Sequence, residues 1–405
     1  MNEIKLSKKN LEAFVLCFSF IPLEAVQLII GTAGYGILLI ITGLIIFLRA
    51  VKIIYKSRQF IIWMFLLLWM IICTLINRQN PIYPIYYVGK VAFWFLINDW
   101  YLRKGSLRLL KVSRKFLEVV VVITLIQQIV APGIFGYTIS MNTRTFFTSD
   151  NFLGYYYTAY IAVSIILDFV EYKKPQKKTY IMTGMCFASI IRAWSVKSVI
   201  GIWLIIMYIL FIYRKKISKL FGLRFLAISF VLIFFGVVIF NVQDNFIGFF
   251  SKYFNKDATV SVRYYLWTQA ISNIKAKPVF GYGIREGQRL MLQETVAGNA
   301  RSSHNIILEL ILEGGFIGIT IYLISIVAAF MNKKESIEGK NKYEYLFLLF
   351  VIFMFFLMEL ASGSIYYPYY YMPIILINNL DKIVNIKLMK ERYYVSQENM
   401  YCYKL

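Results

Sequence analysis

The chain has 405 residues, of which 59% are hydrophobic and only 16% are charged, and its mean hydropathy is +0.63. This composition excludes an ordinary soluble globular protein and predicts an all-α polytopic integral membrane protein. The formal net charge of +23 arises largely from short Lys and Arg clusters between apolar runs. Such clusters are typical of loops at a membrane surface, so we expect no nucleic-acid partner.

Apolar runs predict about twelve transmembrane helices. They are expected at 11–31, 32–51, 60–76, 82–100, 116–132, 152–170, 179–193, 198–213, 221–242, 304–330, 343–361 and 365–380. The domains are therefore 1–242 with nine of these helices, a long loop at 243–303, 304–380 with the last three, and a tail at 381–405. No cleavage site follows the first run, so we expect no removable signal peptide.

Basic clusters distinguish the two sides of this predicted bundle. Arg103-Lys104, the lysine-rich segment 173–178 and Arg214-Lys215-Lys216 all fall in connections on one side. By the positive-inside rule this side is cytoplasmic, together with both termini. A composition rich in Ile, Lys, Asn and Tyr is typical of an AT-rich bacterial genome, so we expect a multi-pass protein of the bacterial cytoplasmic (inner) membrane.

The long loop at 243–303 lies on the extracytoplasmic side in this topology, and loops of such length usually carry function or structure of their own. Apolar residues at helical spacing predict an amphipathic helix over 259–276. Pro278 should end it, and Phe280-Gly281-Tyr282-Gly283 should form a turn. The loop has more basic than acidic residues, which favours an anionic ligand.

His304, the only histidine of the chain, directly follows this loop. It is predicted to lie in the first turn of the next helix, capped by Ser302 or Ser303. A helix N-terminus attracts phosphate and disfavours an imidazolium, so His304 would be neutral and able to act as a general base. The alternative is a polar residue that only marks the membrane surface.

The helix after His304 has a small-residue pattern. Gly314 and Gly318 are spaced for close approach of a neighbouring helix, and Gly315 and Gly318 fall on the same face as His304 if the helix is straight. Packing there would hold the tip that carries His304. Glu309 and Glu313 fall roughly opposite His304, either as structural polar residues or as functional intramembrane acids.

Four motifs together resemble the O-antigen ligase and Wzy-type polymerase superfamily. They are His304-Asn305 with Gly315 and Gly318, Arg263-Tyr-Tyr-Leu-Trp267, Lys277-Pro278-Val-Phe280-Gly281-Tyr282-Gly283, and Ser195-Val-Lys197-Ser198. The resemblance covers about 187–320. Members commonly have arginine where this chain has Lys197, and Arg192 is the alternative for that role.

The resemblance implies a GT-C-like membrane glycosyltransferase that needs no metal and no cofactor, with its active site facing outside. Its donor and acceptor would be glycans linked to undecaprenyl diphosphate. His304 would accept the proton of the acceptor hydroxyl, while Gly315, Gly318 and Asn305 would form the helix packing around the site. The residues implied to bind diphosphate are Arg263, Lys197 or Arg192, and, with weaker claims, Arg301 and Arg285.

Three functions remain open from the sequence. The favoured one is a polymerase that joins lipid-linked oligosaccharide repeat units into a surface polysaccharide, such as capsule or O-antigen. A ligase that transfers the finished glycan to another acceptor shares the same chemistry. A flippase or transporter of lipid-linked oligosaccharide is the alternative of another class, although the chain shows no internal repeat. Membrane lipid, a chain-length regulator and a flippase of the same pathway would be further partners.

Overall fold

A computed structural model describes residues 8–21, 24–131, 145, 147–240, 257–284, 302–331, 339, 341–363 and 365–386. The regular elements formed by these residues are α-helices with short 3-10 and π segments, as an apolar chain in a membrane requires, because helices satisfy their own backbone hydrogen bonds. In this described part, four helices are long and apolar enough to cross a membrane, namely Gly34–Lys56, Arg58–Ile76, Asn151–Tyr172 and Ile306–Phe330.

The N-terminal helices differ from the prediction. Helix α1 (Lys8–Phe20) ends well before residue 31, and α2 (Glu24–Ala50) continues through the expected boundary with a kink at Gly31, where φ is 69°. Hydropathy cannot locate such breaks, because the residues on both sides of them are equally apolar. A 3-10 segment, η1 (Val51–Lys56), then leads to α3 (Arg58–Ile76).

The next elements follow the predicted apolar runs closely. They are α4 (Ile82–Pro84), η2 (Ile85–Gly89), α5 (Lys90–Arg103), α6 (Arg108–Val130), α7 (Asp150–Tyr172), α8 (Lys177–Ala193), α9 (Val196–Met207), η3 (Tyr208–Ile212), η4 (Lys216–Phe221), α10 (Leu223–Phe234) and η5 (Phe235–Ile239). Helix α7 is buried on all sides, so it forms the centre of the bundle.

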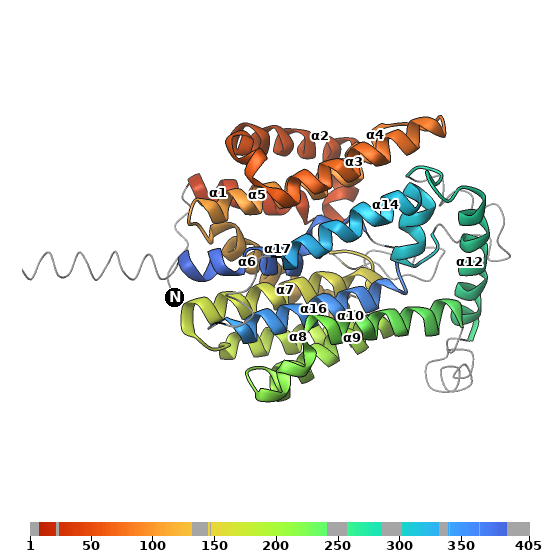
Figure 1. The fold of residues 1–405 in the computed structure, drawn as a ribbon. Helices are drawn as coiled ribbons and strands as arrows, with labels where there is room; N and C mark the ends of the chain where they lie inside the picture. The colour runs from red at the N-terminus through yellow and green to blue at the C-terminus, as the bar shows by residue number, and fades with distance from the viewer. Residues whose placement is uncertain are drawn as a thin grey trace, which may run out of the picture.

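The C-terminal part contains α12 (Asp257–Ala276), α14 (Ile306–Phe330), α16 (Lys342–Glu359), η7 (Pro368–Tyr371) and α17 (Met372–Asn378), and residues 380–386 are also helical. Figure 1 shows α12 lying across the end of the bundle, roughly perpendicular to α7, α14 and α16. A helix in this orientation is placed to cover the tips of the long helices rather than to run beside them.

The two ends of the bundle differ in the side chains that they carry. At one end, Arg103 pairs with Asp99 (2.9 Å) and Arg114 pairs with Asp168 (2.7 Å). We call this the basic end; it is the end predicted to be cytoplasmic. The other, which α12 covers, we call the His304 end.

Candidate active site

The turn at 278–283 is joined to the middle of α14 by backbone hydrogen bonds. The Tyr282 amide donates to the Leu312 carbonyl (2.7 Å), and the Gly283 amide donates to the Glu313 carbonyl (2.9 Å). In return, the Phe316 amide donates to the Pro278 carbonyl (2.8 Å). Two motifs that are separate in the sequence therefore form one unit, in which the turn completes the hydrogen bonds that α14 leaves open.

Gly315 is the residue that opens α14 to this turn. Its φ of 64° and ψ of −170° break the helix, so α14 is not the straight helix on which the predicted face of His304 was drawn. A Cβ atom at Gly315 would lie 1.9 Å from the Val279 carbonyl oxygen, and one at Gly281 would lie 2.5 Å from the Leu312 carbonyl oxygen. Both glycines are needed for this approach, since each also has a positive φ.

The neighbouring helix that packs on the small residues of α14 is α3. Met70 lies against Gly314 and Gly318, and the Trp69 indole donates to the Gly314 carbonyl (2.7 Å). The Trp69 ring also stacks on Phe280 at a centroid distance of 5.4 Å. Helix α3 thereby supports both the kinked helix and the turn that fills its break.

His304 lies just before α14 and not in its first turn. Asn305 is the N-cap, and its side-chain oxygen accepts from the amides of Ile307 (3.0 Å) and Leu308 (3.2 Å). The predicted serine cap is therefore wrong, and these two amides are not open to a phosphate. His304 has a left-handed φ of 51° and is exposed.

The segment before His304 is held by two buried side chains. The carboxylate of Glu309 accepts from the Ser303 amide (3.0 Å) and the Ser303 hydroxyl (2.9 Å), and the Trp267 indole of α12 donates to the Ser303 carbonyl (3.0 Å). The expected position of Glu309 opposite His304 assumed one continuous helix, whereas α14 begins at Ile306 and His304 lies before it. Glu309 holds Ser302 and Ser303, the residues just before His304, in place.

Glu313 lies one turn further along α14 and is completely buried. It accepts a hydrogen bond from the Tyr366 hydroxyl, which belongs to the segment between α16 and α17. The Tyr366 ring in turn lies 5.2 Å from the ring of Tyr87 in η2. Glu313 therefore connects α14 to an aromatic group at the His304 end.

Lys197 reaches the same region from the first turn of α9. Its ammonium group lies 3.4 Å from the Ala361 carbonyl and 5.0 Å from the centre of the Tyr155 ring. Asn305 binds the adjacent carbonyl of Leu360 at 3.2 Å. Asn305, which follows His304, and Lys197 of α9 therefore both contact the backbone at the end of α16.

Of the other predicted diphosphate ligands, Arg192 is the one whose side chain lies among the described residues. Arg192 is exposed at the end of α8, where it donates to the Gln128 carbonyl (3.3 Å) and shares no described partner with Lys197. Arg263 lies on α12, one helical turn before Trp267. Arg285 and Arg301 lie outside the described residues.

Lys90 is a cation of this end that the sequence analysis did not assign to the site. Its ammonium group lies 4.8, 5.3 and 5.5 Å from the ring centres of Tyr86, Tyr87 and Tyr367. Within the described part of the chain it forms no ion pair. Tyr367 stacks on Tyr370 (4.9 Å), and Tyr370 stacks on Tyr155 beneath Lys197 (4.9 Å). The signal in the sequence was a lysine inside an apolar run, which is a functional candidate by default.

The arrangement combines an exposed imidazole, two carboxylates that position its surroundings, and lysines beside stacked tyrosines. Such a set can accept a proton and bind a phosphate-containing group. Among the residues that the structure describes, no group of three or more His, Cys, Asp or Glu side chains could hold a metal ion.

A comparison with protein families matches the segment that contains these residues. Residues 181–323 match the family model described as O-Antigen ligase. A stretch of 127 residues is 27% identical to the exopolysaccharide production protein ExoQ of Rhizobium meliloti (strain 1021), covering 29% of this chain and 29% of that protein. A stretch of 182 residues is 28% identical to the ComP-specific O-oligosaccharyltransferase of Acinetobacter baylyi (strain ATCC 33305 / BD413 / ADP1), covering 42% of this chain and 32% of that protein.

These matches span about a third of the length of either relative. The segment matched by the family model contains Lys197, α12, the turn at 278–283, and His304 with the kinked part of α14. It therefore includes the motifs on which the resemblance to this superfamily was based.

Proposed function

We propose that this chain, whose residues 181–323 match the O-Antigen ligase family model, is a member of the O-antigen ligase and Wzy-type polymerase superfamily and a membrane glycosyltransferase of polysaccharide biosynthesis. Its donor would be an oligosaccharide linked to undecaprenyl diphosphate, and its acceptor a second lipid-linked repeat unit. The enzyme would thus act as a polymerase on the outer face of the bacterial cytoplasmic membrane. The observation that supports this reaction best is the exposed His304, held on a fixed junction beside the end of α16 that Lys197 also contacts.

His304 serves as the general base in this proposal. The oxygen of an acceptor hydroxyl forms a bond to the anomeric carbon of the donor sugar, and the bond from that carbon to the diphosphate oxygen breaks. The proton passes to a ring nitrogen of His304, and the bonding electrons leave with the lipid diphosphate. A single displacement of this kind inverts the anomeric configuration. Positioned proton transfer typically contributes about 10²–10⁴-fold to the rate.

The fixed surroundings of His304 support this role. A base is effective only if it is held within reach of the proton that it accepts, and Asn305, Glu309 and Trp267 all restrain the backbone next to His304. Because these restraints act on the backbone and leave the imidazole exposed, the ring stays accessible to an acceptor. An exposed polar residue that only marked the membrane surface would not need three buried anchors.

The lysines at this end are proposed to bind the diphosphate. Lys197 and Lys90 lie at opposite ends of a stack formed by Tyr155, Tyr370 and Tyr367. Charge-assisted hydrogen bonds from such cations contribute roughly 1.5–3 kcal/mol each and stabilise the charge that grows on the leaving group. Arg263 is proposed as a further ligand, with Arg192, Arg285 and Arg301 as weaker candidates.

A ligase is the second candidate, and the name of one relative favours it. That relative is called an oligosaccharyltransferase specific for ComP, so its name describes transfer to a different acceptor. The two activities differ in the acceptor and not in the proposed chemistry at His304. The proposed base and the proposed cations would serve either acceptor.

The deciding experiment incubates the purified chain, in a membrane mimetic, with lipid-linked repeat units as the only substrate. A ladder of products, each one repeat longer than the last, would establish the polymerase. Products that appear only after a lipid or protein acceptor is added would establish the ligase instead. Movement of intact lipid-linked units across sealed vesicles without any new glycosidic bond would reject both and favour a flippase.

A further inference from the structure

A polar cavity of about 90 Å³ lies at the basic end of the bundle, far along the helices from His304. Its lining comes from the end of η1, the start of α3, α5, and the end of α17 with the segment that follows it. The lining residues are Lys56, Ser57, Arg58, Gln59, Phe95, Asp99, Arg103, Asn378, Asn379 and Lys382. Nothing in the proposed glycosyl transfer uses this cavity, so its polarity calls for another explanation.

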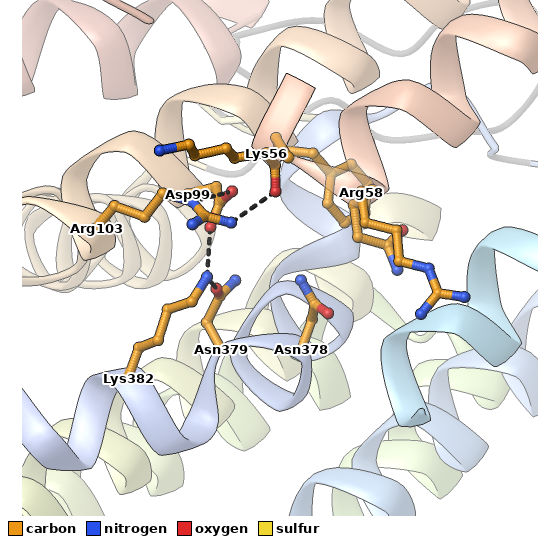
Figure 2. Close-up of a pocket in the computed structure, with 10 residues that line it drawn as sticks. Lys56, Arg58, Asp99, Arg103, Asn378, Asn379 and Lys382 are labelled. Atoms are coloured by element: carbon orange, nitrogen blue, oxygen red, sulfur yellow. Dashed lines mark hydrogen bonds and ion pairs between the residues drawn. The ribbon is translucent and has the colours of Figure 1, made fainter. Parts of the chain in front are cut away.

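The cavity has a strong excess of positive charge. Four of its lining residues are basic, and Asp99 is its single acidic residue. Figure 2 shows Asp99 between Arg103 and Lys382, which bind its two carboxylate oxygens at 2.9 and 2.7 Å. Both oxygens are therefore already paired, and no carboxylate of the described residues neutralises the remaining basic side chains of the lining.

The walls of this cavity are held in place by hydrogen bonds between separate elements. Arg103 donates to the Lys56 carbonyl (2.7 Å), which joins α5 to η1, and Lys382 donates to the Asn379 side chain (2.8 Å). A guanidinium has five N–H donors and an ammonium has three. Arg103 and Lys382 each use only two of theirs in the described contacts, so each keeps donors for a ligand.

The two other cations flank this pair. Lys56 lies 5.2 Å from the ring centre of Tyr55, and Arg58 contacts the sulfur atom of Met331 at 3.4 Å. Figure 2 shows their side chains extending to different sides of the cavity. Neither contact neutralises the charge, so both residues add to a positive field that favours an anion.

Exposed apolar side chains precede Lys56 in the sequence. The exposed side chains of Phe47, Leu48 and Val51 lie on α2 and η1, within three helical turns of Lys56. A charged cavity beside exposed apolar side chains matches a molecule with an anionic head and a hydrocarbon tail. Basic pockets between transmembrane helices bind such headgroups on the cytoplasmic side of membranes.

We propose that this cavity binds the phosphate of an anionic membrane lipid, with Arg103 and Lys382 as direct donors and Lys56 and Arg58 as flanking cations. Guanidinium and ammonium groups are the usual partners of phosphate oxygens. The tail of the lipid would lie along the exposed face of α2. The site would tie η1, α3, α5 and the segment after α17 to the membrane at the end opposite the site of glycan transfer.

The test measures binding of phosphatidylglycerol and phosphatidylcholine to the purified full chain by native mass spectrometry, after removal of loosely bound lipid. The double variant Lys56→Gln/Arg58→Gln removes two cations that pair with no described carboxylate. Lys52→Gln is the matched control, because Lys52 lies in the same 3-10 segment and does not line the cavity. Thermal unfolding of each protein in neutral detergent checks that the fold is kept.

We expect the unchanged protein and Lys52→Gln to retain phosphatidylglycerol over phosphatidylcholine, and the double variant to bind it about tenfold more weakly. Equal binding by all three proteins would overturn the proposal. Tight binding of inorganic phosphate alone, lost in the double variant and without any preference for the anionic lipid, would overturn the lipid as the source and assign the cavity to a soluble phosphate compound.

Discussion

Asn305 and Lys197 donate hydrogen bonds to adjacent carbonyl groups at the end of α16, those of Leu360 (3.2 Å) and Ala361 (3.4 Å). The two residues are far apart in the sequence, yet this pair of contacts places the residue next to the candidate base and the candidate diphosphate ligand on one short piece of backbone. Movement of the backbone at Leu360 and Ala361 would therefore displace Asn305 and Lys197 together.

Replacement of His304 by alanine should lower the rate of glycan transfer by about 10²–10⁴-fold, because the acceptor hydroxyl would lose its general base. The folded protein should remain at normal level in the membrane, since the side chain of His304 is exposed. Chain length on a glycan gel and the rate with purified substrate measure the effect. An unchanged product ladder at normal protein level would reject His304 as the base.

Gly315→Ala should prevent normal packing of the turn on α14. The new Cβ would overlap the Val279 carbonyl oxygen at 1.9 Å, and alanine at a φ of 64° adds strain on the order of 1–3 kcal/mol by itself. We expect a lower thermal unfolding temperature and loss of activity. Gly43→Ala in α2 is the control, because no atom lies within 4 Å of its Cβ. Equal stability of the two variants would show that the close packing of the turn at 278–283 on Gly315 does not stabilise the protein.

Two substitutions at Asn305 separate its cap from its bond to α16. Asn305→Asp keeps an oxygen for the amides of Ile307 and Leu308 but loses the donor to Leu360. Asn305→Ala loses both and should cost a further ~1 kcal/mol of stability, the usual value of an N-cap. We expect both variants to lose activity and only the alanine variant to lose that extra stability, as measured by thermal unfolding. Full activity of Asn305→Asp would show that the bond to Leu360 does not position His304.

Trp267→Phe should lower activity without unfolding the protein. Phenylalanine keeps an aromatic ring in this buried position but cannot donate to the Ser303 carbonyl, so the segment before His304 loses one of its anchors. The rate constant of transfer should fall while the KM for the donor changes little, because Trp267 acts through backbone position and touches no substrate. A change in KM alone would contradict this positioning role.

Lys90→Met distinguishes a ligand-binding cation from a structural one. Removal of a partly buried charge that has no described ion-pair partner should leave stability unchanged or raise it. If Lys90 binds the diphosphate, the KM for the donor should rise about tenfold, the effect of losing one charge-assisted hydrogen bond. Lys104→Met is the control, because Lys104 also lies over an aromatic ring, that of Trp100 at 4.5 Å, but at the basic end. An unchanged KM in Lys90→Met would remove Lys90 from the site.

The amino-acid sequence alone was sufficient for the helical membrane class, for most helix positions between residues 58 and 239, and for the resemblance to the O-antigen ligase superfamily, whose family model matches residues 181–323. Apolar length, basic clusters and short motifs are local properties, so they can be read along the chain. The boundary at residues 31 and 32 was wrong for the same reason, since a kink at Gly31 inside an apolar run leaves hydropathy unchanged.

The tertiary structure alone decided how the site is built. Glu309 and Trp267 meet at Ser303, Gly315 admits the turn at 278–283, and Lys90 lies among tyrosines from two distant segments. Each of these contacts depends on how helices pack and where the chain reverses. The left-handed φ of His304 and the N-cap at Asn305 also place His304 before the helix, which apolar spacing along the sequence did not predict.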